Sequence, residues 1–458
     1  MERRFEVRKQ EILDETKIQP QVIEGMLKRL EHFITPFIRS LGRPEPKANA
    51  GFYISGLLSD LERKNIESIA YRYDQDRRAL QRFIGTAVWD YQPLQQELVR
   101  QVGLELGEDD GVIVFDPSGH KKAGCDSVGV QRQWIGRLGK VDNCQVGIYM
   151  GYASGKEHTL VDERLYLPKK WANNKTLRRK CGVPKQIRYQ TRHELALEML
   201  QNNGPYLPHR WIAGDDEMGR SSGFRRDLRG LDEHYLLAVP SNTTIRDLES
   251  KPPAYGGKGQ PPKQPFERVD RWSHALKEGA WTRIDVRDGE KGPLVTEIAK
   301  RIVMARTERG QDAYSEELLV VTRTQESNGT MKYDYHLSNA LADTPLDELA
   351  RVVKAEHRIE DCLKRAKSEA GLSDYEVRTW DGWHHHQILS LIALWFLIVE
   401  TRRGKKIYPC PDGSTGTDDV VRTVASRLRP QVSWLGQTLH QTKKRTERTC
   451  SILSLQAT

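Results

Sequence analysis

The sequence has no hydrophobic run that is long enough to cross a membrane. Its longest apolar stretch, Ile388–Val399, is about a dozen residues, whereas a membrane-spanning helix needs roughly 20. The first residues, Met1–Arg4, lack the apolar segment that forms the core of a secretory signal. We therefore expect a cytoplasmic protein that does not associate with membranes, and we interpret 388–399 as a buried helix.

The sequence also lacks the cysteine spacing of a disulfide framework or a zinc site. Its six cysteines are scattered, with no Cys-x-x-Cys pair and no histidine at zinc spacing: Cys125, Cys144, Cys181, Cys362, Cys410 and Cys450. The run His384–His386 resembles a metal cluster, but consecutive helical residues point about 100° apart. We expect reduced thiols, and a packed or DNA-facing helix start at the histidines.

Positive charge is in excess and unevenly distributed. The net charge is +9 with a pI near 9.1, and residues 401–458 hold eleven Lys or Arg against four Asp or Glu. A basic tail is often only a solvated end of the chain. The overall balance nevertheless favours an anionic partner, and we interpret that partner as nucleic acid.

The hydrophobic period changes along the chain. Residues 1–105 show helical spacing, and short apolar strands begin at Val112. Strands are predicted at 112–116, 145–153, 158–167, 209–215 and 234–239, with helices near 194–201 and 224–231. Three strands, a helix, a strand, a helix and a strand is the order of an RNase H-like α/β fold, with an antiparallel meander extended by parallel strands.

The expected organisation has five parts. They are a helical DNA-binding domain (1–105), the first part of an RNase H-like catalytic domain (106–240), a β-rich insertion (241–345), the second, helical part of the catalytic domain (346–404) and a basic tail (405–458). In the insertion, strands are expected at 281–286, 317–324 and 332–337. Helices are expected at 345–367 and 382–400, and the tail is expected to be partly helical near 420–428.

Three carboxylates stand where a metal-dependent nuclease needs them. Asp116 and Asp215 each end a predicted strand, and Glu360 lies on a predicted helix with Lys364 and Lys367 on the same face. Mg²⁺ prefers oxygen ligands, and strand ends hold such ligands rigidly. Asp216 competes with Asp215, but neighbouring strand residues point to opposite faces, and we favour Asp215.

Each acid has an ordinary alternative interpretation. An aspartate at a strand end is more often a turn or cap residue, and a helical glutamate near lysine is usually a solvated surface pair. The prediction rests on the three occurring together, in the order that this fold requires.

The motifs around these acids resemble those of DDE-superfamily insertion-sequence transposases, most of all insertion-sequence family 701. The similarity extends from about Gly51 to Phe396. It rests on the segments Tyr53–Leu58, Phe115–Gly124, Gly139–Gly147, Ala213–Gly219, Ile359–Cys362, Lys367–Leu372 and Tyr375–His384.

The resemblance implies that Asp116, Asp215 and Glu360 are catalytic metal ligands. They would hold two Mg²⁺ ions, with Mn²⁺ as a substitute. The related signature has Tyr seven and Arg four residues before the glutamate and Lys seven after it. Lys367 fits, but Val353 and Glu356 occupy the other two positions, so those roles are vacant or supplied by others such as Arg358.

Several side chains are candidates for contacts with DNA. They are Lys121, Lys122, Arg358, Lys364, Lys367, Trp272 and Trp281. The lysines after Asp116 could contact phosphates or form a solvated turn. The two tryptophans could stack on a flipped base, although a tryptophan in such a block more often packs in a core.

The sequence thus predicts a DNA transposase that cleaves transposon ends and joins them to target DNA. Its partners would be double-stranded DNA and a second copy of the chain. Two rival functions are a nuclease of the same fold without strand transfer, and a DNA-binding regulator that no longer cuts. An RNA-binding protein has no support beyond charge.

Overall fold

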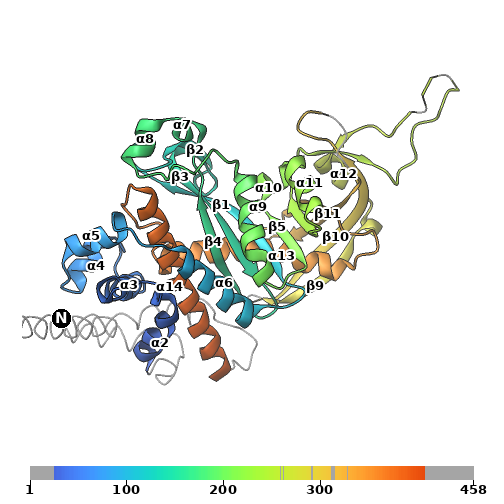
Figure 1. Ribbon diagram of the computed structural model, residues 1–458. Coiled ribbons are helices and arrows are strands. Elements are labelled where there is room, and N and C mark those ends of the chain that lie inside the picture. The colour runs from blue at the N-terminus through green and yellow to red at the C-terminus, as the bar shows by residue number, and fades with distance from the viewer. Residues whose placement is uncertain are drawn as a thin grey trace, which may run out of the picture.

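The computed structural model describes residues 25–257, 259–260, 262–289, 292–310, 315–326 and 328–407 of the chain. The helix expected at 420–428 lies outside these residues. The described part is a mixed α/β structure with one large sheet and a group of N-terminal helices (Figure 1). Its helices include none that is long and apolar enough to cross a membrane.

The N-terminal region is helical, as expected from its periodicity. It contains α2 (Met26–Ile38), α3 (Pro44–Leu57), α4 (Ile66–Arg72), α5 (Arg77–Gly85) and α6 (Gln92–Leu106). Two of the starts are capped by side chains: Asn65 accepts from the Ser68 N–H, and Asp76 accepts from the Arg78 N–H. Such caps satisfy backbone donors that have no partner within the helix.

The first half of the sheet has the predicted strand order. It contains β1 (Val112–Lys121), β2 (Gln131–Ile135), β3 (Lys140–Ala153), β4 (His158–Leu165), β5 (Trp211–Gly214) and β6 (Tyr235–Ala238). Strands β1, β3 and β4 are antiparallel neighbours, and β5 and β6 continue from β1 in parallel. The short edge strand β2, which pairs with β3, was not predicted from the sequence.

The connecting helices of this half lie between β4 and β6. They are α7 (Lys169–Ala172), α8 (Lys175–Lys180), α9 (Arg192–Asn203), α10 (Asp216–Arg220) and α11 (Ser222–Gly230). Short 3-10 turns, η2 (Gly136–Leu138) and η3 (Gly204–Tyr206), connect neighbouring elements. Both predicted helices, at 194–201 and 224–231, are present with slightly wider bounds.

The prediction that Asp116 ends the first strand was wrong. Strand β1 continues to Lys121, which is paired with Cys144 of β3. Only the parallel pairing to β5 stops, at Phe115 opposite Gly214. Because β1 has one neighbour beyond that point, Pro117 fits in the strand, as proline does where one side of a strand is unpaired. Asp116 therefore lies at the start of an open strand edge.

The block that follows β6 extends the same sheet. It contains β7 (Thr244–Asp247), β8 (Glu267–Arg268), α12 (Val269–His274), η4 (Glu278–Ala280), β9 (Thr282–Gly289), β10 (Gly292–Ala305), β11 (Glu317–Gln325) and β12 (Met331–Ser338). Strand β12 pairs with β6, so the expected insertion is joined to the catalytic sheet by backbone hydrogen bonds. A second hydrophobic core, which includes Trp272 and Trp281, forms within this block.

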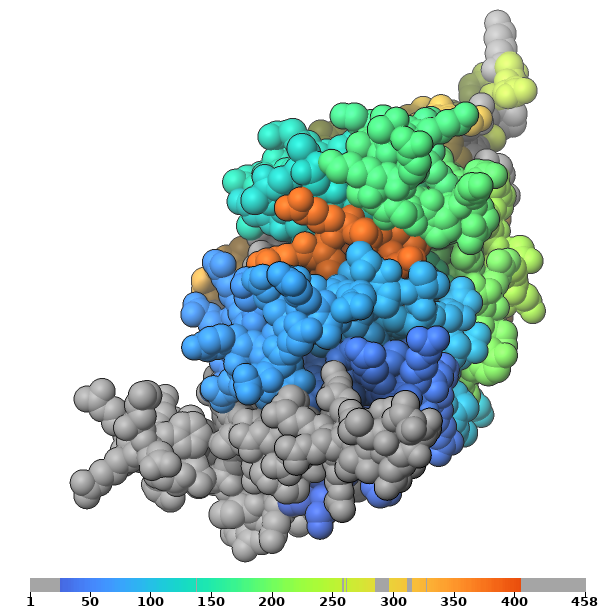
Figure 2. Space-filling view, turned by 60° about the vertical axis from the view of Figure 1, so that its left-hand side comes forward, coloured from blue at the N-terminus to red at the C-terminus, as the bar shows by residue number. Residues whose placement is uncertain are grey.

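Two long helices complete the described structure. Helix α13 (Leu346–Glu369) packs on the sheet so closely that a Cβ added to Gly151 of β3 would overlap Ile359. Helix α14 (Trp380–Ile407) is buried over most of its length and begins between the N-terminal helices and the sheet region (Figures 1 and 2).

The three consecutive histidines of α14 pack against the N-terminal helices and the residues beside them. The ring of His385 stacks on Trp89 at 3.7 Å, and Nδ1 of His386 lies 2.8 Å from the Tyr53 hydroxyl. All three histidines are buried. This agrees with the expected packed helix start.

Candidate active site

Asp116 lies on β1 immediately beyond the parallel pairing to β5. Its side chain is half-buried, and burial together with the charges of Glu360, Glu356 and Glu217 raises its pKa to about 7. Lys367 acts in the opposite direction and lowers this pKa. A buried carboxyl among other carboxyls is expected to hold a proton or a cation.

Asp215 follows β5 and caps α10. Its Oδ1 accepts from the Met218 N–H at 3.1 Å, and burial and the charge of Asp116 raise its pKa well above the ordinary value. Asp216 is exposed and lies 3.7 Å from Arg220. The structure thus brings Asp215, and not Asp216, into the electrostatic range of Asp116.

Asp215 and Asp216 do not differ because of side-chain alternation along a strand, which was the reason given for preferring Asp215 in the sequence. Strand β5 ends at Gly214, so Asp215 is the cap and Asp216 is the first residue of α10. A cap side chain turns back toward its own helix, whereas the first-turn residue points outward.

Glu360 lies on α13, where its side chain is 62% exposed. Its carboxylate lies 3.8 Å from Nδ1 of His357, and this contact lowers the pKa of Glu360. The charge of Glu360 still acts on Asp116. In the part of the chain that the structure describes, no three His, Cys, Asp or Glu side chains are spaced to hold a metal ion.

A further carboxylate, Glu356, lies one helical turn before Glu360. Its side chain is only 14% exposed, lies 3.5 Å from Nε2 of His336, and raises the pKa of both Asp116 and Asp215. In the sequence, Glu356 was considered only because it occupies the position where the related signature has an arginine. Its spacing of four residues from Glu360, which puts both on one helix face, was the available signal.

The carboxylates at this site fit a hard divalent cation in chemistry and charge. Asp116, Asp215 and Glu356 provide only oxygen donors. The charge of Asp116 raises the pKa of Asp215, and the charge of Glu356 raises the pKa of both aspartates. A divalent cation bound among them would remove this repulsion. The assignment of individual ligands stays a prediction.

Lys367 lies beside Asp116, in agreement with its predicted place near the acids. Its Nζ donates to Oγ of Ser118 at 2.7 Å, which joins α13 to β1 two residues beyond Asp116. Lys364 is exposed on the same helix. Arg358 points elsewhere, because its guanidinium donates to the Ser154 carbonyl at the β3–β4 turn.

The lysines after Asp116 have different surroundings. Lys121 is exposed and lies 3.3 Å from Asp142. Lys122 is half-buried, donates to the Tyr375 carbonyl at 2.9 Å and lies 3.3 Å from the centre of the Tyr375 ring.

The two tryptophans of the β-rich block occupy its core. Trp272 donates to Asp247 at 3.1 Å, and the ring of Trp281 lies 4.4 Å from the Arg323 guanidinium. Their exposures are only 5% and 9%. These contacts favour the core interpretation, and base stacking stays a prediction.

Comparison with known proteins identifies the class to which this fold and site belong. The sequence model of the family described as DDE superfamily endonuclease matches residues 36–293, which is more than half of the chain. The chain belongs to this family. The matched range contains Asp116 and Asp215 and ends before α13, so it does not reach Glu360.

A particular relative agrees with the resemblance found in the sequence motifs. The probable transposase for insertion sequence element IS701 from Microchaete diplosiphon is 29% identical over 248 residues. The alignment covers 52% of this chain and 59% of that protein, so the chain spans less than two thirds of its relative. The predicted membership of the DDE superfamily is confirmed.

A solved structure shows a remote likeness. The piggyBac transposase in a synaptic complex with hairpin DNA matches 87% of this chain and 75% of its own, with 9% identity and a TM-score of 0.43.

Proposed function

We propose that this chain is a DNA transposase that cleaves the ends of its element and joins them to target DNA. The observation that carries the proposal is the pair of half-buried, mutually repelling aspartates, Asp116 and Asp215, at the point where the parallel pairing of β1 and β5 ends. Family membership and the named function of the IS701 relative support it.

The catalytic part would be an RNase H-like domain. The pairing order β4, β3, β1, β5, β6, with an antiparallel first part and a parallel second part, supports this assignment. In such a sheet, the two neighbouring parallel strands that correspond to β1 and β5 carry acids at one edge, and a helix packed on the sheet supplies another. Here that helix is α13, with Glu360 and Glu356 on one face.

The acids would bind metal ions, and a lysine would contact the DNA. Asp116, Asp215 and Glu360 would bind Mg²⁺, or Mn²⁺ in its place. When bound, two such ions activate the attacking oxygen and stabilise the leaving oxygen of the phosphodiester. Lys367, held by Ser118, would orient a phosphate next to Asp116. Because two transposon ends must be cut together, a homodimer on double-stranded DNA is part of the proposal.

The decisive experiment is Mg²⁺-dependent cleavage of a plasmid that carries the native DNA flanking the gene. Wild type is compared with Glu360→Gln, Glu356→Gln and the exposed control Asp216→Asn. We expect cleavage at the junctions by wild type and Asp216→Asn, and a loss of at least a hundredfold in Glu360→Gln with DNA binding retained, as for removal of a group acting in the transition state.

Other outcomes separate the rival functions. Cleavage without strand-transfer products would indicate a nuclease of the same fold, and binding without cleavage in Mg²⁺ or Mn²⁺ would indicate a regulator. Cleavage that survives Glu360→Gln but is lost in Glu356→Gln would assign the third carboxylate to Glu356.

A further inference from the structure

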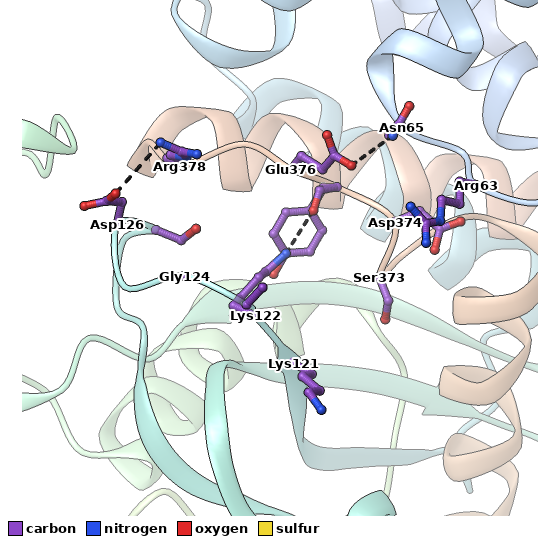
Figure 3. A pocket seen from close by; sticks show the side chains of 13 residues that line it. Arg63, Asn65, Lys121, Lys122, Gly124, Asp126, Ser373, Asp374, Glu376 and Arg378 are labelled. Atoms are coloured by element: carbon purple, nitrogen blue, oxygen red, sulfur yellow. Dashed lines mark hydrogen bonds and ion pairs between the residues drawn. The ribbon is translucent and has the colours of Figure 1, made fainter.

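A polar pocket of about 480 Å³ lies beyond the end of β1 (Figure 3). Three segments that are distant in sequence form its walls. They are the loop after β1 (residues 121–127), the connection between α13 and α14 (residues 373–378), and Arg63 with Asn65 from the N-terminal helical region. The end of strand β1, which carries Asp116, and the N-terminal helical region thus both contribute to this pocket.

The carboxylates of the pocket already have partners within the protein. Asp126 lies 2.6 Å from the ammonium of Lys180. Asp374 accepts from the Lys64 N–H at 3.1 Å, and Glu376 accepts from the Asn65 amide at 3.0 Å. Asp374 and Glu376 therefore join the α13–α14 connection to the N-terminal region, and Asp126 is paired with α8.

Two of the cations form no ion pair with any residue that the structure describes. Arg63 is exposed and makes no hydrogen bond either. Lys122 is half-buried and contacts the carbonyl and ring of Tyr375, while the charges of Glu376 and Asp374 act on it without an ion pair. In Figure 3, Lys122 lies near the centre of the pocket, with Arg63 to one side of it. An anion in this pocket would meet two cations without displacing an existing ion pair.

The pocket is connected to Asp116 by one face of β1. Alternate residues from Asp116 to Lys122 share this face, because side chains alternate along a strand. Oγ of Ser118 accepts from Lys367, and Nδ1 of His120 lies 3.0 Å from Oγ of Ser373. Six residues of strand span roughly 20 Å. Neighbouring phosphates of one B-DNA strand are about 3.4 Å apart along the helix axis, so a phosphate at this distance lies several nucleotides from the one at Asp116.

We propose that this pocket binds one phosphate of the DNA strand that is cut at the candidate active site, with Arg63 and Lys122 as its cationic contacts. The bound phosphate lies several nucleotides from the scissile one. The inference rests on the proposed function and adds a contact from the N-terminal region to it. Arginine suits this role because its guanidinium can bind two phosphate oxygens at once.

The first test measures how salt affects DNA binding by the full-length protein without Mg²⁺. The probe is a duplex of the DNA flanking the gene, and wild type is compared with Arg63→Ala. The control is Arg271→Ala, an exposed arginine on α12. Each lost phosphate contact reduces the slope of log K against log salt by about 0.9.

The expected result is therefore quantitative. Between about 50 and 200 mM salt, the affinity of Arg63→Ala should fall about 3.5-fold less than that of wild type. Arg271→Ala should behave as wild type. Equal slopes for wild type and Arg63→Ala would overturn the inference while leaving the proposed function intact, whereas absence of duplex binding by wild type would overturn the proposed function itself.

A second test locates the contact. A neutral methylphosphonate is placed at single positions of the same duplex, and one position several nucleotides from the cleavage site should weaken binding by wild type but not by Arg63→Ala. Lys122→Gln, with its folding checked by thermal melting, should show the same insensitivity. Inorganic phosphate could raise the melting temperature of wild type but not that of Arg63→Ala. If Arg63→Ala then binds DNA as wild type does, the pocket binds free phosphate and the DNA assignment is wrong.

Discussion

The guanidinium of Arg225 lies 2.7 Å from the carboxylate of Glu317, and the two side chains are only 4% and 3% exposed. This pair joins α11, which follows Asp215, to β11 of the β-rich block. Arg225 also donates to the Gly219 carbonyl, and Glu317 accepts from the Tyr235 hydroxyl at 2.6 Å. The buried pair therefore fixes α10, α11 and the second half of the sheet against one another.

Removal of one member of this pair should destabilise the fold strongly. Glu317→Gln leaves the buried Arg225 guanidinium without a counter-charge, and the expected cost is about 3–5 kcal/mol in the free energy of unfolding. Urea denaturation measures it. The control is Asp227→Asn, which breaks the exposed pair of Arg226 and Asp227 and should cost less than about 1 kcal/mol. Equal costs for the two variants would show that the buried pair is not a structural link.

A second prediction concerns the close contact between α10 and β6. A Cβ added to Gly219 would overlap the backbone carbonyl of Ala238, so Gly219→Ala must push the helix away from the strand. Because Asp215 caps this helix, cleavage should fall together with thermal stability. Gly223→Ala on α11 is the matched control, since its added Cβ would meet only Oγ of Ser221 at 3.7 Å. Full activity and stability in Gly219→Ala would contradict this packing.

A third prediction concerns stability in acid. Burial lowers the pKa of His384 to about 3, whereas an unfolded histidine titrates near 6.5. Below pH 6.5 the unfolded chain therefore binds a proton that the folded chain does not, and the free energy of unfolding falls as the pH falls. Above pH 6.5 this group has no effect. From pH 6.5 to 5 the loss from His384 should be about 2 kcal/mol.

The variant His384→Phe tests this directly. Phenylalanine keeps a ring next to Tyr91, against which His384 stacks at 4.8 Å, and removes a buried Nε2 that has no hydrogen-bond partner among the described residues. Urea denaturation measures the free energy of unfolding at several pH values. Between pH 6.5 and 5, this free energy should fall by about 2 kcal/mol less in His384→Phe than in wild type. The exposed His32→Gln serves as control. An unchanged pH dependence in His384→Phe would mean that another group causes the acid loss.

The sequence predicted those features that depend on local patterns. Strands β1, β3, β4, β5 and β6 follow from short apolar runs, whereas the choice of Asp215 over Asp216 as a metal ligand stays a prediction. The end of β1 was mispredicted because Pro117 and Gly119 are local signals of a strand end, whereas pairing with β3 continues through them. No local pattern reports such long-range pairing.

The rest of the site depends on contacts between distant segments. Glu356 became a candidate only when α13 was seen to pack on the sheet beside Asp116 and Asp215. The pairing of β12 with β6 likewise joins segments about a hundred residues apart. The sequence showed only that the intervening block is rich in strands.

The last prediction separates the two adjacent aspartates by metal binding without DNA. If Asp215 is a ligand, Mg²⁺ or Mn²⁺ binds the folded state and raises its melting temperature, because a ligand that binds only the folded state stabilises it by RT ln(1 + [L]/Kd). At about a hundred times Kd this stabilisation is about 2.7 kcal/mol. Asp215→Asn should lose the shift, and Asp216→Asn should keep it, since that side chain is exposed and lies beside Arg220. A shift that is lost in Asp216→Asn and kept in Asp215→Asn would reverse the assignment, because the metal would then bind on the outer side of α10.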